Sequence, residues 1–198
     1  MNLKGKNIII TGLSLGIGRE TAKNMISKGA NVLITGRSES RLKQAQKYSG
    51  AKIIEFDIAD MDNIAENAKK CIDILDGRID VLVNNAGIGV GKSIDKLNIE
   101  DFSRVFNVNV FGLALFTKEI IPLMIKESYG TIVNIGSTAS LKGYKNGSIY
   151  SSSKFAVRCL TQCWQAELRQ YNIRVCQVNP SEVTTAFGSS DRIERENV

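Results

Sequence analysis

Short, continuously apolar runs alternate along the whole chain with longer segments of helical periodicity, and this alternation limits the possible folds most strongly. The apolar runs lack the apolar-polar alternation of half-buried strands, so we expect strands that are buried on both faces. Strands of that kind, separated by helices, are typical of a doubly wound α/β fold with a parallel sheet and helices on both faces. The expected strands cover Asn7–Thr11, Asn31–Thr35, Lys52–Asp57, Asp80–Asn84, Thr131–Ile135 and Arg174–Asn179.

Segments with helical periodicity fill the intervals between these runs. No linker divides the chain, and 198 residues is a usual length for one domain with a substantial core. We therefore predict a single domain over residues 1–198, in which residues 186–198 form a polar and charged tail. The expected helices cover Gly16–Lys28, Ser40–Ser49, Asp62–Leu75, Ile99–Ile125 and Ser148–Tyr171.

The chain contains no histidine, and this absence removes several kinds of active site. A histidine general base, a Ser-His-Asp triad and a histidine-ligated metal are excluded, so acid-base chemistry must rest on Tyr, Lys, Asp, Glu or Cys. The cysteines form no Cys-x-x-Cys pair, although two of them share one face of an expected helix. We expect reduced, buried thiols and no metal site; the cysteines are Cys71, Cys159, Cys163 and Cys176.

The net charge of +6 and the isoelectric point of about 9.2 are compatible with attraction to an anionic cofactor or to nucleic acid. The basic residues are dispersed, with no run of five or more, so we favour a solvated basic surface and no nucleic-acid partner. No run of 18 apolar residues is present, and residues 1–6 lack the features of a signal peptide. We expect a cytoplasmic protein without a membrane partner.

A glycine-rich turn joins the first expected strand to the first expected helix. Gly12 permits a tight turn, Gly16 lets the backbone approach a pyrophosphate, and Gly18 lets the helix pack closely on the strand. The N-terminus of the helix then offers free N–H groups to phosphate charge. The alternative is an ordinary turn between a strand and a helix, but strand, turn and helix follow in the order that a dinucleotide site needs.

The spacing Gly-x-x-x-Gly-x-Gly after Thr11 resembles the short-chain dehydrogenase/reductase family, in its single-domain branch, and the resemblance extends over essentially the whole chain. It implies a Rossmann fold and an oxidoreductase that transfers hydride between a nicotinamide cofactor and a carbonyl or alcohol. Members similar to 3-oxoacyl-[acyl-carrier-protein] reductases act on thioesters, and others act on ketones, aldehydes, sugars or steroids. The resemblance also implies a homodimer or homotetramer, and it places Ser14 and Ile17 at the cofactor.

Arg37 determines which form of the cofactor we expect. An NAD enzyme needs an acidic residue at the end of the second strand, where this chain has Gly36 followed by Arg37. A guanidinium at this place can bind a 2′-phosphate, and Ser38 can add a hydroxyl, so we predict NADP(H) rather than NAD(H). The family's other common basic position, inside the glycine turn, is Leu15 here, and Arg37 could also be an ordinary surface arginine.

Two further segments match cofactor contacts of the family. Asp57 resembles the residue that binds the adenine amine, with Ile58 packed beside the ring, although Asp57 could equally cap the turn that follows. The segment Asn84-Asn85-Ala86-Gly87 ends the fourth expected strand and matches the family's Asn-Asn-Ala-Gly motif. The resemblance therefore adds to the expected cofactor site Asn84, Ala86 and Gly87.

Tyr150 and Lys154 lie four residues apart, so they share one face of the last expected helix. A nearby lysine cation stabilises a phenolate and is expected to lower the pKa of Tyr150, which lets the phenol exchange a proton with a carbonyl or alcohol. Such a pair also occurs by chance on helix surfaces. In the family that this chain resembles, the tyrosine is the acid-base residue and the lysine also binds the nicotinamide ribose.

Two more residues complete the resemblance to the family's catalytic site. Ser137 follows the fifth expected strand, at the edge where open α/β sheets bind ligands, and matches the serine that orients the substrate oxygen. Asn109 matches the helix asparagine that holds a water in a proton relay; without that role it would be a buried polar residue in a helix. Because these residues occur together with Tyr150 and Lys154 in family order and spacing, we predict an enzyme.

The segment after the sixth expected strand departs from the family pattern. Pro180 is followed by Ser181 where the family has glycine, and Pro180, Val183 and Thr185 are expected to contact the cofactor, the last two at the nicotinamide carboxamide. Family members continue for roughly a third of a domain beyond Val198, so we expect a poorly closed pocket and reduced activity. The alternative to an enzyme is a non-catalytic NADP-binding sensor or scaffold.

Contacts with substrate and with other subunits are expected from position alone. Tyr144 and Phe187 are expected to line an apolar pocket, and neither identifies a substrate. Phe111, Phe116 and Trp164 lie on helices that the family uses for dimer contacts, with packing in the core as the alternative.

Overall fold

The computed structural model describes residues 2–12, 16–181 and 183. Within these residues the strands form one sheet in the order β3-β2-β1-β4-β5-β6, and every neighbouring pair is parallel. The strand order reverses after β3, where the chain crosses back to place β4 beside β1. This confirms the expected doubly wound sheet, whose strands are β1 (Asn7–Ile10), β2 (Asn31–Gly36), β3 (Lys52–Glu55), β4 (Val81–Asn84), β5 (Gly130–Ile135) and β6 (Ile173–Val178).

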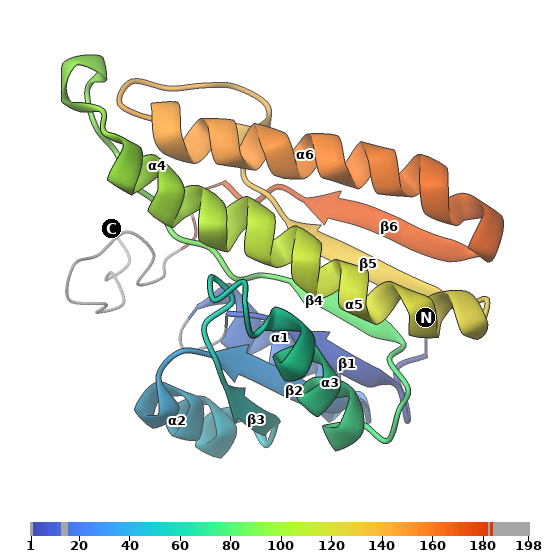
Figure 1. Cartoon of the computed structure of the whole chain (residues 1–198). Helices are drawn as coiled ribbons and strands as arrows, with labels where there is room; N and C mark the ends of the chain where they lie inside the picture. Colours follow the sequence, from blue (N-terminus) through green and yellow to red (C-terminus); the bar gives the residue numbers. More distant parts are fainter. Residues whose placement is uncertain (1, 13–15, 182, 184–198) are drawn as a thin grey trace.

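Helices cover both faces of the sheet and give the molecule three layers (Figure 1). One face packs against α1 and α2, and the other packs against α3, α5 and α6. The main helices are α1 (Ile17–Ser27), α2 (Glu39–Ser49), α3 (Ile64–Ile74), α4 (Ile99–Phe106), α5 (Leu113–Lys126) and α6 (Ser148–Leu168). Shorter helical segments are η1 (Ile94–Lys96), η2 (Asn107–Gly112), η3 (Thr138–Ser140) and η4 (Arg169–Tyr171).

Side chains alternate between the two faces along each strand, so the sheet has a hydrophobic core on each side. Ile8 and Ile10 of β1 pack with Leu42 of α2 in one core, whereas Ile9 packs with Phe116 of α5 in the other. All five side chains are buried. The apolar runs in the sequence are therefore continuous because helices cover both faces of these strands.

The long helix expected over Ile99–Ile125 is continuous in the structure but not uniform. A π-helix, η2, separates α4 from α5, and Pro122 lies inside α5. By length and composition alone, Ile99–Lys126 could cross a membrane, but half of its apolar window is buried inside the fold, as in a core helix. A π-helix widens the helical turn and is frequent at functional sites, and here the wide turn contains Asn109.

The cysteines differ in exposure, which corrects part of the prediction of buried thiols. Cys71 is buried, and burial raises the pKa of its thiol to about 12. Cys176 is half-buried, and Cys159 and Cys163 are exposed on α6. The prediction is wrong for these two because they lie on the side of α6 that faces away from the sheet.

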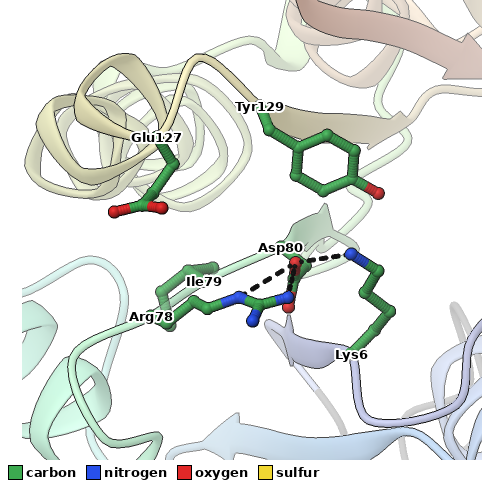
Figure 2. A pocket seen from close by; sticks show the side chains of 6 residues that line it. All are labelled: Lys6, Arg78, Ile79, Asp80, Glu127 and Tyr129. Carbon is green, nitrogen blue, oxygen red and sulfur yellow. Dashed lines mark hydrogen bonds and ion pairs between the residues drawn. The ribbon is translucent and has the colours of Figure 1, made fainter.

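One buried carboxylate joins the strands at the amino edge of the sheet (Figure 2). Asp80 is 1% exposed; its Oδ1 accepts hydrogen bonds from Lys6 at 3.0 Å and Arg78 at 2.7 Å, and its Oδ2 accepts from the Asn7 amide at 2.9 Å. These side chains lie beside Tyr129 in a pocket of about 190 Å³. Desolvation acts to raise the pKa of Asp80, but the hydrogen bonds from Arg78, Asn7 and Lys6 hold it below its usual value.

Candidate active site

Gly12, which follows β1, lies directly against the segment that ends β4. Gly12 has a φ of 73°, a left-handed conformation that favours glycine, and a Cβ at this position would overlap the backbone of Ala86. Gly16, with a φ of 80°, immediately precedes α1. Ile17 opens the helix and Gly18 is buried in it, so the N-terminal amides of α1 begin at this turn.

Asn85, which the predicted set of site residues omits, ties this turn to β4. Its Nδ2 donates to the carbonyls of Thr11 at 2.9 Å and Gly12 at 3.0 Å. In return, Thr11 Oγ1 accepts from the amides of Asn85 and Ala86, both at 3.2 Å. As the second asparagine of the Asn-Asn-Ala-Gly motif, Asn85 could have been selected from the sequence. Its hydrogen-bond partners could not, because they depend on the pairing of β1 with β4.

Arg37 and Asp57 lie side by side where β2 and β3 end. Arg37 Nη1 is 3.7 Å from Asp57 Oδ2, and the two side chains are 55% and 40% exposed. Asp57 Oδ1 also accepts from the Ala59 amide at 2.9 Å, so it caps the following turn as well. The structure thus brings together the two residues predicted for the adenosine end of the cofactor and leaves the guanidinium accessible.

A second carboxylate lies close to the same place. Glu55, the last residue of β3, accepts from the backbone amide of Glu39 at 3.2 Å, at the start of α2. Ser38 precedes this helix, and its hydroxyl lies 3.2 Å from that of Ser40. Glu55 was not among the predicted site residues, because its contact with α2 follows from the pairing of β2 with β3.

Two residues predicted at the cofactor have side chains in the core beneath it. Ile58 is 8% exposed and belongs to the same core as Phe116. Asn84 is 2% exposed, and its Nδ2 donates to Thr117 Oγ1 and to Asn134 Oδ1, both at 2.9 Å. Both side chains pack in the layer between the sheet and α5 and support the fold from inside, and their contact with the cofactor stays a prediction.

Ser137 lies just after β5 and caps the N-terminus of η3. Its hydroxyl accepts from the Ala139 amide at 3.1 Å, and its own amide donates to Ser140 Oγ at 3.1 Å, which together form a capping box. The Ser137 hydroxyl also hydrogen-bonds to the phenol of Tyr150. The structure therefore brings these two predicted residues together at the carboxyl edge of the sheet.

Lys154 follows Tyr150 by one turn of α6, with its Nζ 5.9 Å from the centroid of the phenol ring. The residue is 4% exposed, and its Nζ donates to the carbonyl of Ile135 at 2.7 Å. Burial lowers the pKa of Lys154 to about 8. Gly87 adjoins this amine, because a Cβ at Gly87 would lie 3.6 Å from Nζ.

The pKa of Tyr150 is raised, not lowered as the sequence predicted. Desolvation raises it most, the phenol of Tyr144 adds to the rise, and the hydrogen bond with Ser137 opposes it. Lys154 does not reverse the effect, since burial disfavours its own cation and its Nζ is directed to Ile135. In the protein alone, the Tyr150 phenol is therefore protonated at neutral pH.

Asn109 lies fully buried in the π-helix η2. Its Oδ1 accepts from the Ile88 amide at 2.9 Å, and its Nδ2 donates to the Ile88 carbonyl at 2.9 Å and to Ser153 Oγ at 3.0 Å. These bonds join η2 to the segment after Asn-Asn-Ala-Gly and to the residue before Lys154. Asn109 thus lies within the predicted group, and it holds the backbone on which that group is built.

The carboxyl edge of the sheet combines two adjoining parts. The glycine turn, the start of α1 and the Arg37–Asp57 pair fit the phosphates and adenosine of a dinucleotide. Ser137, Tyr150 and Lys154 can orient an oxygen and exchange a proton with it. Among the described residues, no three acidic or thiol side chains are grouped to hold a metal ion.

A family model described as short chain dehydrogenase matches residues 6–196 of the chain. The chain belongs to the short chain dehydrogenase family. This short chain dehydrogenase is 37% identical over 191 residues to the 3-oxoacyl-[acyl-carrier-protein] reductase FabG of Thermotoga maritima, and the alignment covers 93% of the chain and 77% of the relative.

Solved structures of similar fold include proteins bound to either dinucleotide. ElxO with NADP bound has a TM-score of 0.82 and 32% identity, over 89% of this chain and 73% of that one. NAD⁺-bound xylitol dehydrogenase has a TM-score of 0.84 and 30% identity, over 91% and 72%. The short chain dehydrogenase is therefore an oxidoreductase of a family that binds NAD(P)(H) and acts on small molecules.

The segment after β6 in this short chain dehydrogenase lies against η3. The carbonyl of Pro180 accepts from the Thr138 amide at 2.9 Å, and Val183 is 48% exposed. This contact places the start of the segment beside Ser137. Three residues from the prediction lie outside the described part of the chain, namely Ser14, Thr185 and Phe187.

Proposed function

We propose that this short chain dehydrogenase transfers hydride between NADP(H) and a carbonyl or alcohol substrate, with Tyr150 as the acid-base residue. The observation that carries this proposal is the meeting of Ser137, Tyr150 and Lys154 at one edge of the sheet. Ser137 hydrogen-bonds to the phenol, and a buried amine lies one helical turn away. A protein that only bound the dinucleotide could use the lysine for the ribose, but it would have no physical need to place a serine hydroxyl and a phenol beside that buried amine.

The site residues have distinct parts in the proposed reaction. The bound nicotinamide supplies the hydride in reduction and accepts it in oxidation. Ser137 donates a hydrogen bond to the substrate oxygen, and Tyr150 gives that oxygen its proton. The raised pKa of Tyr150 keeps the phenol protonated at neutral pH, as a proton donor requires. Lys154, with a pKa of about 8, can then hold the proton that restores the phenol.

Arg37 supports NADP(H) as the cofactor. Its guanidinium is half exposed at the end of β2 and only loosely paired, 3.7 Å from Asp57, so its charge is available to a 2′-phosphate. NAD(H) is the alternative because the carboxylates of Asp57 and Glu55 lie nearby, and carboxylates accept hydrogen bonds from ribose hydroxyls.

The segment before α6 favours an apolar carbonyl substrate. Leu141 is 53% exposed and Tyr144 is 55% exposed, in the segment that joins η3 to α6. Tyr144 lies close enough to Tyr150 to contribute to the rise in its pKa. We propose a 3-oxoacyl thioester or a simple ketone or aldehyde as the substrate class, and the name of the Thermotoga maritima relative supports the first of these.

The experiment that tests this function separates cofactor binding from turnover. NADPH and NADH are titrated by fluorescence, and a panel of 3-oxoacyl thioesters, ketones and aldehydes is then scanned for loss of the reduced-nicotinamide absorbance. We expect tighter binding of NADPH and turnover of at least one class. Binding without turnover of any member would contradict the catalytic proposal and favour a sensor or scaffold, and tighter binding of NADH would contradict the role of Arg37.

A further inference from the structure

Three side-chain amides stand side by side beneath the active site, and we call them the amide row. Asn84 of β4 is the register partner of Asn134 of β5, and Asn134 is the register partner of Gln177 of β6. Residues two apart along a strand point to the same face, so all three point toward α5 and α6, as do the core residues two positions earlier. Polar groups therefore cross the sheet at the level just below Ser137.

Threonines from the two covering helices bind the amide row. Asn84 Nδ2 donates to Thr117 Oγ1 of α5 and to Asn134 Oδ1, and Asn134 Nδ2 donates to Thr161 Oγ1 of α6 at 2.8 Å. The Thr161 hydroxyl also lies 3.2 Å from Gln177 Oε1. Both threonines and both asparagines are at most 3% exposed. Hydrogen bonds in such a dry layer are strong and costly to break, so the row is a rigid support.

Asn179 connects the amide row to Ser137. Gln177 Nε2 donates to Asn179 Oδ1 at 2.5 Å, and the same oxygen accepts from the backbone amide of Ser137 at 3.2 Å. The Ser137 amide shares its hydrogen between Asn179 and Ser140 Oγ at 3.1 Å. A single side-chain oxygen thus joins the end of β6 to the residue that hydrogen-bonds to Tyr150.

Gly136 leaves the space in which these two amides meet. A Cβ at Gly136 would overlap Asn179 Oδ1 and Gln177 Nε2. Gly136 does not have a positive φ, so the position requires the absence of a side chain and not the conformational freedom of glycine. Its backbone amide donates to the Val178 carbonyl at 2.8 Å, which extends the contact between β5 and β6 up to Ser137.

We propose that Asn179, supported by Gln177, is a positioning residue that fixes Ser137 where its hydroxyl meets both Tyr150 and the substrate oxygen. The catalytic consequence rests on the proposed function; the structural support does not. Small displacements of an orienting group are costly in catalysis. The Ser137 hydroxyl also makes the hydrogen bond that opposes the rise in the pKa of Tyr150, so a displaced serine affects the phenol as well.

The variant Asn179→Leu tests this proposal, because leucine keeps the side-chain volume and removes the acceptor oxygen. We expect kcat for carbonyl reduction to fall about tenfold, the loss of roughly one hydrogen bond, while the Kd for NADPH is unchanged. The pH midpoint of alcohol oxidation should move to higher pH, since the phenol loses the Ser137 hydrogen bond. Gln177→Leu should change both quantities in the same direction by a smaller amount, and it provides a second test if Asn179→Leu does not fold.

Gln165→Leu is the matched control. Gln165 Nε2 donates to the Val175 carbonyl at 3.0 Å, so this variant removes an amide contact between α6 and β6 that does not involve Ser137. Its kcat and pH midpoint should equal those of the wild type. A fall in kcat for Asn179→Leu with no shift of the pH midpoint, or an equal fall for Gln165→Leu, would overturn the proposal in favour of general stabilisation of β6.

Amide hydrogen exchange gives a readout that does not need turnover. The Ser137 amide should exchange faster in Asn179→Leu than in the wild type and in Gln165→Leu, because it loses one of its two acceptors. Equal exchange in all three proteins would overturn the proposal. If the wild-type protein turns over no carbonyl substrate, the proposed function fails, and the exchange rates still decide whether Asn179 holds Ser137.

Discussion

At the residue scale, burial acts on Tyr150 and Lys154 in opposite directions. Desolvation disfavours the charged form of each group, so it raises the pKa of the phenol and lowers that of the amine to about 8. Lys154 is therefore less able to stabilise a phenolate than its spacing from Tyr150 suggests. The positive charge of an oxidised nicotinamide would act on the phenol in addition to Lys154 and favour proton transfer in the direction of alcohol oxidation.

Tyr150→Phe should bind NADPH as the wild type does and lose turnover by about 10² to 10⁴, the usual contribution of a positioned acid-base group. The matched control is Tyr144→Phe, which removes a neighbouring phenol hydroxyl that we place outside the proton transfer. Fluorescence titration measures binding, and the absorbance of the reduced cofactor measures turnover. Equal activity of the wild type and Tyr150→Phe would exclude Tyr150 as the proton donor.

The buried Lys154 should leave a signature in the pH dependence of stability. Its folded-state pKa of about 8 lies below the ordinary lysine value of 10.5, so between these values the unfolded state binds more protons and stability rises with pH. Lys154→Met removes this effect. The stability of the wild type relative to this variant should increase by about 2 kcal/mol from about pH 7 to about pH 10, as measured by urea unfolding. The exposed control Lys142→Met should show no such trend. If the difference in stability between the wild type and Lys154→Met does not change with pH, the lowered pKa of Lys154 is contradicted.

Arg37→Asp should shift the cofactor preference toward NADH. The change removes the guanidinium that we assign to the 2′-phosphate and adds a carboxylate that accepts hydrogen bonds from ribose hydroxyls. We expect the ratio of the NADPH and NADH dissociation constants to change by at least about tenfold, which corresponds to about 1.4 kcal/mol. An unchanged ratio would remove Arg37 from the cofactor site. Arg41→Asp, in the first turn of α2, is the control for the change in charge.

At the scale of secondary-structure elements, the site lies where the strands end and the helices begin. Side-chain hydrogen bonds join these ends to one another. Thr11 and Asn85 hold the end of β1 to the end of β4, and Asn179 holds the end of β6 to Ser137. The π-helix η2 turns Asn109 toward Ile88. At the opposite edge of the sheet, Asp80 has the same joining role without any part in the proposed chemistry.

Asp80→Asn should destabilise the fold by about 2 kcal/mol near neutral pH, because Lys6 and Arg78 lose their shared carboxylate at a buried position. The folded-state pKa of Asp80 lies below the ordinary aspartate value of 3.8, so the stabilisation is present above about pH 4 and is lost as the pH falls through the folded-state value. Urea unfolding at neutral and acidic pH measures this. The difference in unfolding free energy between the wild type and Asp80→Asn should shrink at acidic pH. The exposed control Asp95→Asn should show little effect at either pH. A difference for Asp80→Asn that stays constant with pH would contradict the role of the carboxylate.

At the scale of the whole molecule, η2, α5 and α6 cover the same face of the sheet, and each exposes an apolar side chain. Phe111 is 49% exposed, Phe155 is 42% exposed and Leu115 is 38% exposed. Phe116, expected from the sequence at a dimer contact, is fully buried in the core, and Trp164 packs partly against the same core. Of the three aromatic residues proposed for subunit contacts, Phe111 is therefore the one most available to a second subunit.

We propose that the protein forms a homodimer or a homotetramer through the surface that carries these side chains. Phe155→Asp places a charge within it and should shift the protein toward the monomer, because burial of an unpaired carboxylate is costly. Size-exclusion chromatography with light scattering measures the molecular mass. The control Ile94→Asp changes an apolar residue that is 84% exposed on η1 and should keep the wild-type mass. A wild-type monomer would contradict the expectation directly.

The amino-acid sequence by itself determined the alternation of strands and helices, the turn at Gly12 and Gly16, and the common helix face of Tyr150 and Lys154. These features depend on local periodicity and spacing, which a short segment specifies without knowledge of its neighbours. For the same reason, the boundaries of strands and helices predicted from the sequence lie within a few residues of the observed ones. The π-helix η2 was not predicted, since the residues around it have an ordinary helical pattern.

Only the tertiary structure decided which groups meet and how water is excluded from them. The side chain of Asn84 turns to Thr117, Asn179 reaches Ser137, and the pKa of Tyr150 rises instead of falling. Each outcome depends on elements far apart in sequence, namely the register of β4, β5 and β6 and the helices that cover them. Desolvation and hydrogen-bond partners are properties of that packing, so no local pattern in the chain specifies them.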